Sequence, residues 1–339
     1  MQNKISILLP VFNEEANIEP VYFAINKVFK NLPEFEYEII FVDDGSTDNT
    51  LVAIELLSNK TNNVFYVSFS RNFGKDNALM AGLKYSTGDA LITMDADLQH
   101  PPEMIPELIA AWQEGFDVVY TYRENKNRHA DFFNQISSKL FYNTVNKLSE
   151  VQLENGIADF RIIDRKVVNV IANLTESNPF FRGLVKWVGF KQKAIPYTPD
   201  TRENGETKYS KWSLMHLAMT GITSFSTKPL SFAIYLGFFF SFASILYIPY
   251  AIYSIYAGFA ISGWASIIVT IAFFGGLQLM ILGIIGLYLG KSFMQSKERP
   301  RYIVSSANIR KSEKKESNQS KLPTRKNNNE MESTSDTTF

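Results

Sequence analysis

The sequence predicts an α/β protein built on an open, mostly parallel β-sheet with helices on both faces, followed by a pair of membrane-spanning helices. Two observations support this. Short apolar runs alternate with amphipathic stretches up to residue 122, which is the pattern of successive β-α-β units and therefore of a parallel sheet. Residues 229–290 contain no Asp, Glu, Lys or Arg, and so long an uncharged apolar stretch is typical of helices that cross a bilayer.

We expect a strand at each apolar run and a helix in each amphipathic stretch between the runs. Such strands, buried on both faces, are continuously apolar, whereas the helices show one apolar stripe. The strands are expected at 5–9, 38–42, 64–69, 90–94 and 117–122, and the helices at 17–31, 48–59, 75–86 and 102–114.

Polar segments follow the first four apolar runs, and the ligands of open parallel sheets bind beyond the carboxyl ends of the strands. None of these segments is a glycine-rich loop of the dinucleotide-binding or P-loop kind. A diphosphate bound here would therefore need another source of positive charge. The segments are PVFNEE, DDGS, SRNFGK and DADLQ.

The fourth segment carries two acids, Asp95 and Asp97, at alternate positions. Side chains alternate along an extended segment, so both carboxylates point to the same side, where they repel each other unless a cation lies between them. Hard oxygen ligands of this kind suit Mg²⁺ or Mn²⁺ shared with substrate phosphates. An isolated Asp-x-Asp pair more often has a structural or capping role. The position after a strand, beside other polar strand ends, favours a metal site here.

The second and third segments also carry charges suited to a nucleotide. Asp43 and Asp44 diverge because they are neighbours, so one could accept hydrogen bonds from a base or ribose while the other orients the loop. The alternative is capping of the following helix. Arg71 and Lys75 lead into a helix whose N-terminus favours anions, which makes them candidate diphosphate ligands, or else surface charges on a loop.

Residues 229–290 are expected to cross the membrane twice. A crossing helix needs about 20 apolar residues, so two spans near 231–254 and 264–289 fit, with a short uncharged turn between them. Lys and Arg residues flank both ends, which places both flanks in the cytoplasm by the positive-inside rule. The alternative is a buried helical hairpin of a soluble protein.

Four regions are expected along the chain: an α/β domain over 1–165, a loop and juxtamembrane region over 166–228, the two helices over 229–290, and a tail over 291–339. In the second region, residues 211–225 predict an amphipathic helix at the membrane surface, or an ordinary helix packed on the domain. From about residue 296 the composition predicts disorder. The tail is basic and could rest on anionic lipid, or serve only to keep the chain soluble.

Composition limits the class of partner and the compartment. The chain has 34 Lys and Arg against 34 Asp and Glu, so its net charge offers no case for binding nucleic acid. It has no cysteine, which agrees with a reducing compartment. The N-terminal apolar run is too short for a signal peptide, so we expect the first domain to stay in the cytoplasm.

Seven motifs together resemble one enzyme family. They are PVFNEE, FVDDGSTDNT, SRNFGKDNALMAGL, MDADLQHPPE, ADFRIIDR, FFRGLVKWVGF and RENGETKYS, in that order. The chain resembles family 2 glycosyltransferases of the polyprenyl-phosphate type, such as bactoprenol glucosyltransferases and the related dolichol-phosphate mannose synthases, over about residues 4–290. Two positions depart from the family's usual pattern: Asp76 where Glu is frequent, and His100 where Asp is frequent.

The resemblance implies a GT-A type fold that uses a nucleotide sugar and a divalent metal, Mg²⁺ or Mn²⁺. It assigns Asp97 and Asp159 to catalysis, the latter as the candidate base. The metal ligands that it implies are Asp95, Asp97 and Gln99. The residues that it places around the nucleotide sugar are Pro10, Val11, Asn13, Glu14, Asp43 and Asp95, and the candidate diphosphate ligands Arg71 and Lys75 complete the predicted set.

The lipid phosphate is expected to meet basic residues, because the guanidinium fork suits phosphate. Arg202 and Lys208 lie just before the membrane in the loop that the resemblance assigns to the acceptor. An acceptor phosphate monoester has a second pKa near about 6 and is already largely dianionic at neutral pH. Asp159 therefore acts either as a base or as a structural ion-pair partner. The acceptor set is Arg123, Arg161, Arg202 and Lys208, chosen from basic residues that also include Arg128, Arg182 and Lys211.

The sequence thus predicts a multi-pass enzyme of the bacterial cytoplasmic membrane, with its catalytic domain and tail in the cytoplasm. It transfers a hexose with inversion, glucose from UDP-glucose, to undecaprenyl or another polyprenyl phosphate. A GDP-mannose or aminosugar transferase with the same acceptor is the alternative enzyme. A catalytically silent membrane scaffold or lipid-binding subunit is the non-enzymatic alternative, and a homo-oligomer is compatible with all three.

Overall fold

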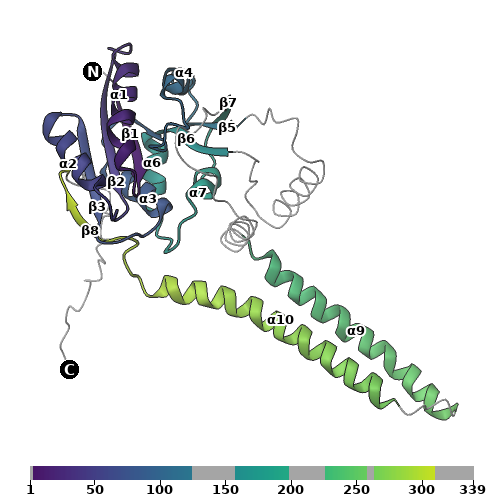
Figure 1. Cartoon of the computed structure of the whole chain (residues 1–339). Helices are drawn as coiled ribbons and strands as arrows, with labels where there is room; N and C mark the ends of the chain where they lie inside the picture. Colours follow the sequence, from purple (N-terminus) through teal and green to yellow (C-terminus); the bar gives the residue numbers. More distant parts are fainter. Residues whose placement is uncertain (1–2, 124–156, 198–225, 258–262, 310–339) are drawn as a thin grey trace, which may run out of the picture.

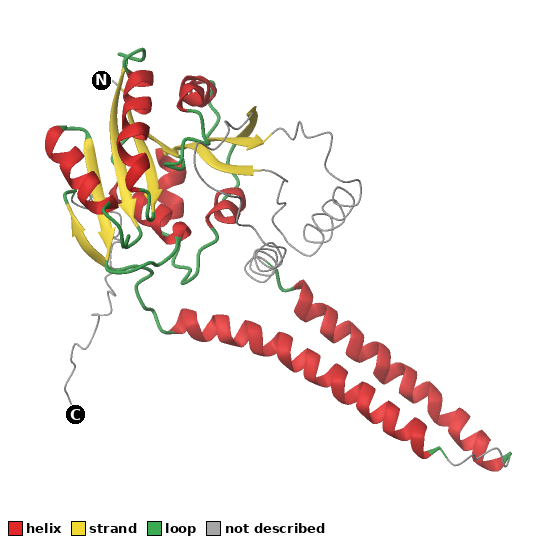
Figure 2. Ribbon diagram, viewed as in Figure 1, coloured by secondary structure: helices red, strands yellow, loops and turns green. Residues whose placement is uncertain are grey.

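The structure is a computed structural model that describes residues 3–123, 157–197, 226–257 and 263–309. In this part of the chain, one eight-stranded sheet carries helices on both faces, and two long helices extend away from it (Figures 1 and 2). The strand order is β7-β5-β6-β4-β1-β2-β3-β8. The strands are β1 (Asn3–Val11), β2 (Phe35–Asp43), β3 (Val64–Phe69), β4 (Ala90–Thr93), β5 (Val118–Arg123), β6 (Ile157–Asp164), β7 (Gln192–Tyr197) and β8 (Val304–Ala307).

The sheet is parallel in its centre and mixed towards its edges. β1 pairs in parallel with β2 and β4, β2 with β3, and β5 with β7. β6 runs antiparallel between β4 and β5, and β8 runs antiparallel to β3. The carboxyl ends of the parallel strands β1, β2 and β4 therefore meet the beginning of β6 at one edge of the sheet.

Two hydrophobic clusters hold the helices on the sheet. One face is covered by the helices whose apolar residues Ile18, Ile54 and Leu108 pack on the central strands. The other face packs Leu79, Val167 and Leu184 against the reverse sides of those strands. The first face carries α1 (Ile18–Phe29), α2 (Thr50–Lys60) and α4 (Ile105–Gln113), and the second carries α3 (Lys75–Tyr85), α6 (Arg165–Ala172) and α7 (Phe181–Trp187).

The expected α/β sheet with helices on both faces is confirmed, with bounds close to those predicted for its first five strands and four helices. Short 3₁₀ turns, Glu15–Asn17 and Pro102–Met104, begin two of the predicted helices. The sheet also extends beyond the predicted domain limit at 165, because β7 and β8 belong to it.

The prediction of a tail without structure from about residue 296 is wrong for Val304–Ala307, which form the edge strand β8. The polar composition of this segment suits an edge strand, because only one side of it pairs and much of it faces solvent. Residues 310–339 of the tail and the amphipathic helix expected at 211–225 lie outside the described residues.

The two long helices are α9 (Lys228–Tyr256) and α10 (Trp264–Ser296), which run side by side in opposite directions (Figures 1 and 2). The ring of Phe240 lies 5.6 Å from that of Phe273 and 5.4 Å from that of Phe274. Among the described residues, one helical stretch, Val269–Ser296, is long and apolar enough to cross a membrane. The apolar stretch found in α9, Lys228–Ala243, is shorter, so the crossing at 231–254 stays a prediction.

Gly88 allows the chain to pass directly over β1 before β4 begins. A Cβ atom at this position would lie 2.7 Å from both the Lys4 carbonyl oxygen and the Ser6 nitrogen. Because these are backbone atoms, the strand itself would have to shift. We expect Gly88→Ala to lower the free energy of unfolding by about 1–3 kcal/mol, measured by denaturant titration in detergent. The control is Gly276→Ala, where a Cβ meets open space; equal stability of the two variants would contradict the prediction.

Candidate active site at the carboxyl edge of the sheet

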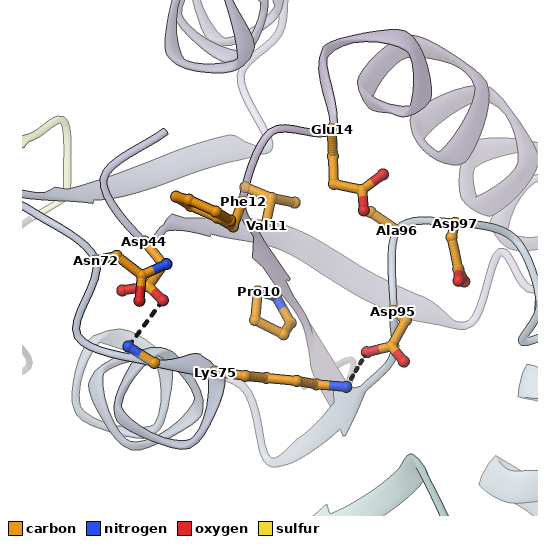
Figure 3. Close-up of a pocket in the computed structure, with 11 residues that line it drawn as sticks. Pro10, Val11, Phe12, Glu14, Asp44, Asn72, Lys75, Asp95, Ala96 and Asp97 are labelled. Atoms are coloured by element: carbon orange, nitrogen blue, oxygen red, sulfur yellow. Dashed lines mark hydrogen bonds and ion pairs between the residues drawn. The ribbon is translucent and has the colours of Figure 1, made fainter. Parts of the chain in front are cut away.

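A cavity of about 380 Å³ opens at the carboxyl ends of the central parallel strands. Figure 3 shows Glu14, Asp95 and Asp97 on one side of it, Asp44 on the other, and the Lys75 side chain reaching across to Asp95. This is the edge where ligands of open α/β sheets bind. The cavity is lined by Pro10, Val11, Phe12, Glu14, Asp44, Asn72, Gly74, Lys75, Asp95, Ala96 and Asp97.

The turn after β4 holds the two acids in place. The backbone N–H of Asp95 donates to Nδ1 of His100 at 3.0 Å. The backbone N–H of Gln99 donates to a carboxylate oxygen of Asp97 at 3.1 Å, and Leu98 between them has a left-handed φ of 58°. His100 is buried, and this burial lowers its pKa, so a neutral imidazole accepts the Asp95 bond. His100 is therefore a support for the acidic turn.

Asp159 at the start of β6 is the centre of an ion-pair cluster. Arg182 of α7 donates two hydrogen bonds to it, from Nε to Oδ1 at 2.7 Å and from Nη2 to Oδ2 at 2.8 Å. Lys75 Nζ lies 2.8 Å from Asp159 Oδ2 and 2.5 Å from Asp95 Oδ1. Arg161 adds a third cation, with Nη2 3.5 Å from Asp159 Oδ1. The lysine thus joins the acid of β6 to the acid that follows β4.

The charges of this cluster are stabilised by one another. Burial disfavours the charge of Asp159, but Lys75, Arg182 and Arg161 outweigh it and hold the pKa of that carboxyl well below its usual range. Burial likewise opposes the charge of Lys75, yet Asp159 and Asp95 raise the pKa of the lysine above its ordinary value. Asp159 is therefore ionised at neutral pH and is a weak proton acceptor.

The second segment, DDGS, supports the loop that presents Lys75. The Asp44 carboxylate accepts the backbone N–H groups of Phe73 at 2.7 Å and of Gly74 at 2.9 Å. Gly45 has φ of 72°, and a Cβ there would lie 2.4 Å from the carbonyl carbon of Arg71. The two loops are packed backbone to backbone, so Asp44 orients the loop, as one of the two neighbouring acids was expected to do.

The side chain of Asp43 is buried, with 1% of it exposed, and it does not line the cavity. Its carboxylate accepts bonds from the Ser46 backbone N–H at 3.0 Å and the Ser68 hydroxyl at 2.7 Å. The expected contact between Asp43 and a nucleotide stays a prediction, while Asp44, which had no substrate role assigned to it, lines the cavity.

Of the residues predicted around the nucleotide sugar, Pro10, Val11, Glu14, Lys75 and Asp95 line the cavity, together with Asp97. Asn13 has a left-handed φ of 56° and its side-chain oxygen accepts the Thr47 N–H at 2.8 Å. It lines a neighbouring acidic hollow of about 400 Å³ that shares Glu14 with the main cavity.

Arg71 and Gln99 lie beside the cavity without lining it. The guanidinium of Arg71 lies 4.0 Å from the centre of the Phe73 ring. The side-chain oxygen of Gln99 accepts a bond from Arg123 Nη2 at 3.0 Å, and Arg123 Nε donates to the Tyr197 hydroxyl at 3.0 Å. Arg123, predicted to bind the acceptor phosphate, is thus placed next to the acidic turn.

Arg161 was predicted to bind the acceptor phosphate, but it is only 2% exposed. Its Nη2 donates to the Ala158 carbonyl at 2.8 Å, and burial lowers its pKa to about 10. Among the described residues Arg161 is thus buried and paired with Asp159, and its contact with an acceptor phosphate stays a prediction. Arg202 and Lys208 lie outside the described residues.

Asp95 and Asp97 fit the ligand chemistry of a hard divalent cation. Within the described residues, no three His, Asp or Glu side chains cluster closely enough to hold a metal ion. Mg²⁺, however, is usually held by one or two carboxylates and completes its shell with water and substrate phosphates. The Asp95 side chain is 32% exposed, and both carboxylates face the cavity in Figure 3, so the pair meets this lower requirement.

The fold and the site together define an α/β protein with paired acids and a lysine at a cavity on the carboxyl edge of its sheet. The family model for glycosyl transferase family 2 matches residues 6–171. A bactoprenol glucosyl transferase from Shigella phage SfX is 41% identical over 89% of this chain and 99% of its own. The putative glycosyltransferase CsbB from Bacillus subtilis is 41% identical over 94% of this chain and 97% of its own. The chain belongs to glycosyl transferase family 2.

Among solved structures, the chain is similar to the mannosyltransferase PcManGT from Pyrobaculum calidifontis in complex with GDP-Man and Mn²⁺. The identity is 16%, the TM-score is 0.46, and the match covers 88% of this chain and 85% of that one.

Sequence reasoning did not single out Arg182 or Asp76 as parts of the site. Arg182 was one of several basic residues considered for the lipid phosphate, and its position in FFRGL gave no sign that it would meet Asp159. Asp76 follows Lys75 at the start of α3 and interacts with the N-terminus of α7 through the Phe181 N–H. Both contacts join segments far apart in sequence, so local patterns could not reveal them.

Asp76 makes the stability of the site depend on pH. Burial and the nearby charge of Asp159 raise the pKa of Asp76 to about 6, whereas an unfolded Asp titrates near about 3.9. A raised acid pKa means that the native state loses stability as pH rises from about 4 to about 6. Asp76→Asn removes this loss and keeps an acceptor for Phe181. We expect the variant to gain up to about 3 kcal/mol relative to the natural chain between pH 4 and pH 7, measured by denaturant unfolding.

Asp117→Asn is the matched control, because its effect on stability is expected to change with pH in the opposite direction. Although burial opposes it, hydrogen bonds from the Lys166 side chain and the Lys191 backbone lower the pKa of Asp117. The charge of Asp117 therefore stabilises the native state above the pKa of the unfolded chain. The free energy of unfolding of Asp117→Asn is expected to fall relative to that of the natural chain as pH rises. A stability difference for Asp76→Asn that does not change with pH would refute the coupling.

Proposed function

We propose that the protein transfers a hexose with inversion, glucose from UDP-glucose, to undecaprenyl or another polyprenyl phosphate at the cytoplasmic face of the bacterial membrane. The observation that carries the proposal is the pair Asp95 and Asp97 with Lys75 at the cavity, in a chain of glycosyl transferase family 2. Relatives named bactoprenol glucosyl transferase, about 40% identical over most of the chain, support the glucose and the lipid acceptor.

The donor is proposed to lie in the cavity with its diphosphate near Lys75 and the N-terminus of α3. The backbone N–H groups at the start of a helix favour an anion, and Lys75 adds a full positive charge there. Glu14, which lines both hollows, and Asn13, which lines the acidic one, are proposed to bind the nucleoside. Asp44 acts through the backbone: by holding Phe73 and Gly74 it keeps the Lys75 loop in place.

Asp95 and Asp97 are proposed to hold Mg²⁺ or Mn²⁺, together with Gln99. A divalent ion there supplies electrostatic stabilisation of the charge that develops on the leaving diphosphate. The chain's own contribution is to present two carboxylates on one rigid turn, fixed by His100 and by the Gln99 backbone N–H.

The acceptor phosphate is proposed to attack the anomeric carbon as a dianion, because its second pKa is near about 6. The bond from that carbon to the nucleoside diphosphate breaks in the same step, and the diphosphate leaves from the opposite face. No strong base is then required, which agrees with an Asp159 that three cations keep ionised. Asp159 is assigned to positioning Lys75 and Arg182. Arg123 beside the acidic turn, with Arg202 and Lys208, is proposed to meet the lipid phosphate.

Both α9 and α10 are proposed to cross the membrane, with the α/β domain and the tail on the cytoplasmic side. The uncharged stretch 229–290 supports this, and so does the antiparallel packing of the two helices in Figure 1. The Tyr288 hydroxyl donates to the Ser226 carbonyl at 2.6 Å, so the ends nearest the domain lie together.

A donor screen tests the reaction. The purified full-length protein in lipid vesicles is incubated with polyprenyl phosphate, Mg²⁺ or Mn²⁺, and one labelled donor at a time: UDP-glucose, GDP-mannose or a UDP-aminosugar. Mass spectrometry of the lipid product is expected to show one added glucose. Transfer from GDP-mannose or the aminosugar donor alone would replace the donor assignment. No lipid-linked sugar from any donor would favour the silent scaffold.

Asp97→Asn tests the metal assignment. The substitution keeps the shape of the side chain but removes one of the two charges that bind the cation. We expect metal-dependent turnover to fall about 100-fold or more, with an unchanged melting temperature. The control is Glu107→Gln, which neutralises an exposed acid on α4 and is expected to retain full activity. Undiminished turnover in the Asp97 variant would remove this residue from the site.

A further inference from the structure

The last turn of α10 and the segment after it contact the α/β domain, and we call residues 295–308 the C-terminal brace. In Figure 1 the chain leaves the end of α10, passes beneath the domain and joins the edge of the sheet as β8. The brace therefore connects the apolar helix α10 to the domain that holds the site. None of its residues has a part in the proposed reaction.

The first contact of the brace is an amide clamp. The Gln295 side-chain oxygen accepts the Ser177 backbone N–H at 2.7 Å, and its Nε2 donates to the Thr175 carbonyl at 2.8 Å. Arg301 Nη2 donates to the Leu174 carbonyl nearby. These bonds hold the loop between α6 and α7, only a few residues before Arg182.

The second contact is made along β3. The ring of Tyr302 stacks on that of Phe69, with centroids 4.8 Å apart, and the Ser70 N–H donates to the Ile303 carbonyl at 2.9 Å. Asn308 closes the strand pair by accepting the Tyr66 N–H at 2.6 Å. β3 leads directly into the loop that carries Lys75.

The brace thus holds the two segments that deliver the Arg182 and Lys75 cations to Asp159, and it is covalently continuous with α10. A side-chain amide that makes two bonds to a backbone loop fixes both position and direction, unlike a single flexible contact. The chain also continues from the domain into α9, so attachment through the brace adds a second connection to the helix pair and restricts rotation of the domain relative to α10.

We propose that the C-terminal brace sets the orientation of the site relative to α10, with Gln295 as its positioning residue, so that reaction with an acceptor embedded in the bilayer depends on it. The inference rests on the proposed function for the nature of the acceptor. A water-soluble acceptor reaches the cavity whatever the angle of the domain, whereas a phosphate held at the bilayer surface reaches it only at the correct angle.

The test compares two acceptors for one enzyme. The full-length protein in lipid vesicles is supplied with a long-chain polyprenyl phosphate in the bilayer or with a water-soluble, short-chain isoprenyl phosphate. Gln295→Leu removes both clamp bonds, and Asn308→Ala provides a second variant that loosens the other end of the brace. The control is Gln278→Leu, the same change in the same helix, about 25 Å away along its axis.

We expect Gln295→Leu to lower kcat/KM for the bilayer acceptor about tenfold and to leave that for the soluble acceptor within about twofold, since a misplacement of about 1 Å can cost far more. The ratio of kcat/KM for the bilayer acceptor to that for the soluble acceptor is expected to fall in Asn308→Ala as well. Gln278→Leu is expected to leave this ratio unchanged. An equal fall for both acceptors, or an unchanged ratio in both brace variants, overturns the proposal.

A distance measurement separates this proposal from the proposed function. The chain has no cysteine, so a single Glu107→Cys variant can carry a fluorescent donor, with an acceptor dye in the bilayer. Gln295→Leu is expected to broaden the range of energy-transfer distances, and an unchanged distribution overturns the brace. If the natural chain transfers sugar to neither acceptor, the proposed function fails. The distance measurement still tests whether the brace orients the domain.

Discussion

The buried carboxylate of Asp159 is the constraint on which the arrangement of the site depends. A charge that is 4% exposed is tolerated in a protein only when cations and hydrogen bonds compensate for it. Lys75, Arg161 and Arg182 come from α3, β6 and α7, so these three elements must converge for the charge to be paired. Removal of one cation would leave an uncompensated charge, and the cluster therefore couples the folding of these elements to the geometry of the cavity.

The same cluster explains why one lysine can serve two acids. Lys75 Nζ lies between Asp159 and Asp95, and it therefore links the interior ion pairs to the acidic turn at the cavity. An anionic substrate entering there meets an ammonium group whose position is already set, so little reorganisation is needed on binding. In the proposed reaction this preorganised charge acts on the departing diphosphate, where electrostatic stabilisation contributes most.

Local patterns predicted the parts of the protein that local interactions determine. The apolar runs located the first five strands, and the position of Asp95 and Asp97 after the fourth run located the cavity, because strand ends in a parallel sheet share one edge. The contact between Arg182 and Asp159 and the place of Asp44 in the cavity lining were not predicted, since the direction of each side chain depends on a loop distant in sequence. β6, β7 and β8 were missed for a related reason. Their pairing partners are remote, and β8 is too short and polar to show a strand pattern.

The edge of the sheet links the α/β domain to the apolar helix α10. Without β8, β3 would present an unpaired row of backbone groups, which natural proteins normally cover. The chain covers it with the segment that follows its apolar helix α10, so one set of hydrogen bonds both completes the sheet and ties the domain to that helix. A free linker at this place would let the cavity rotate relative to α10, and in the proposed reaction the effective concentration of the lipid phosphate at the cavity would then fall. Pairing of the edge strand is therefore a requirement of the sheet that also limits how the cavity can turn relative to α10.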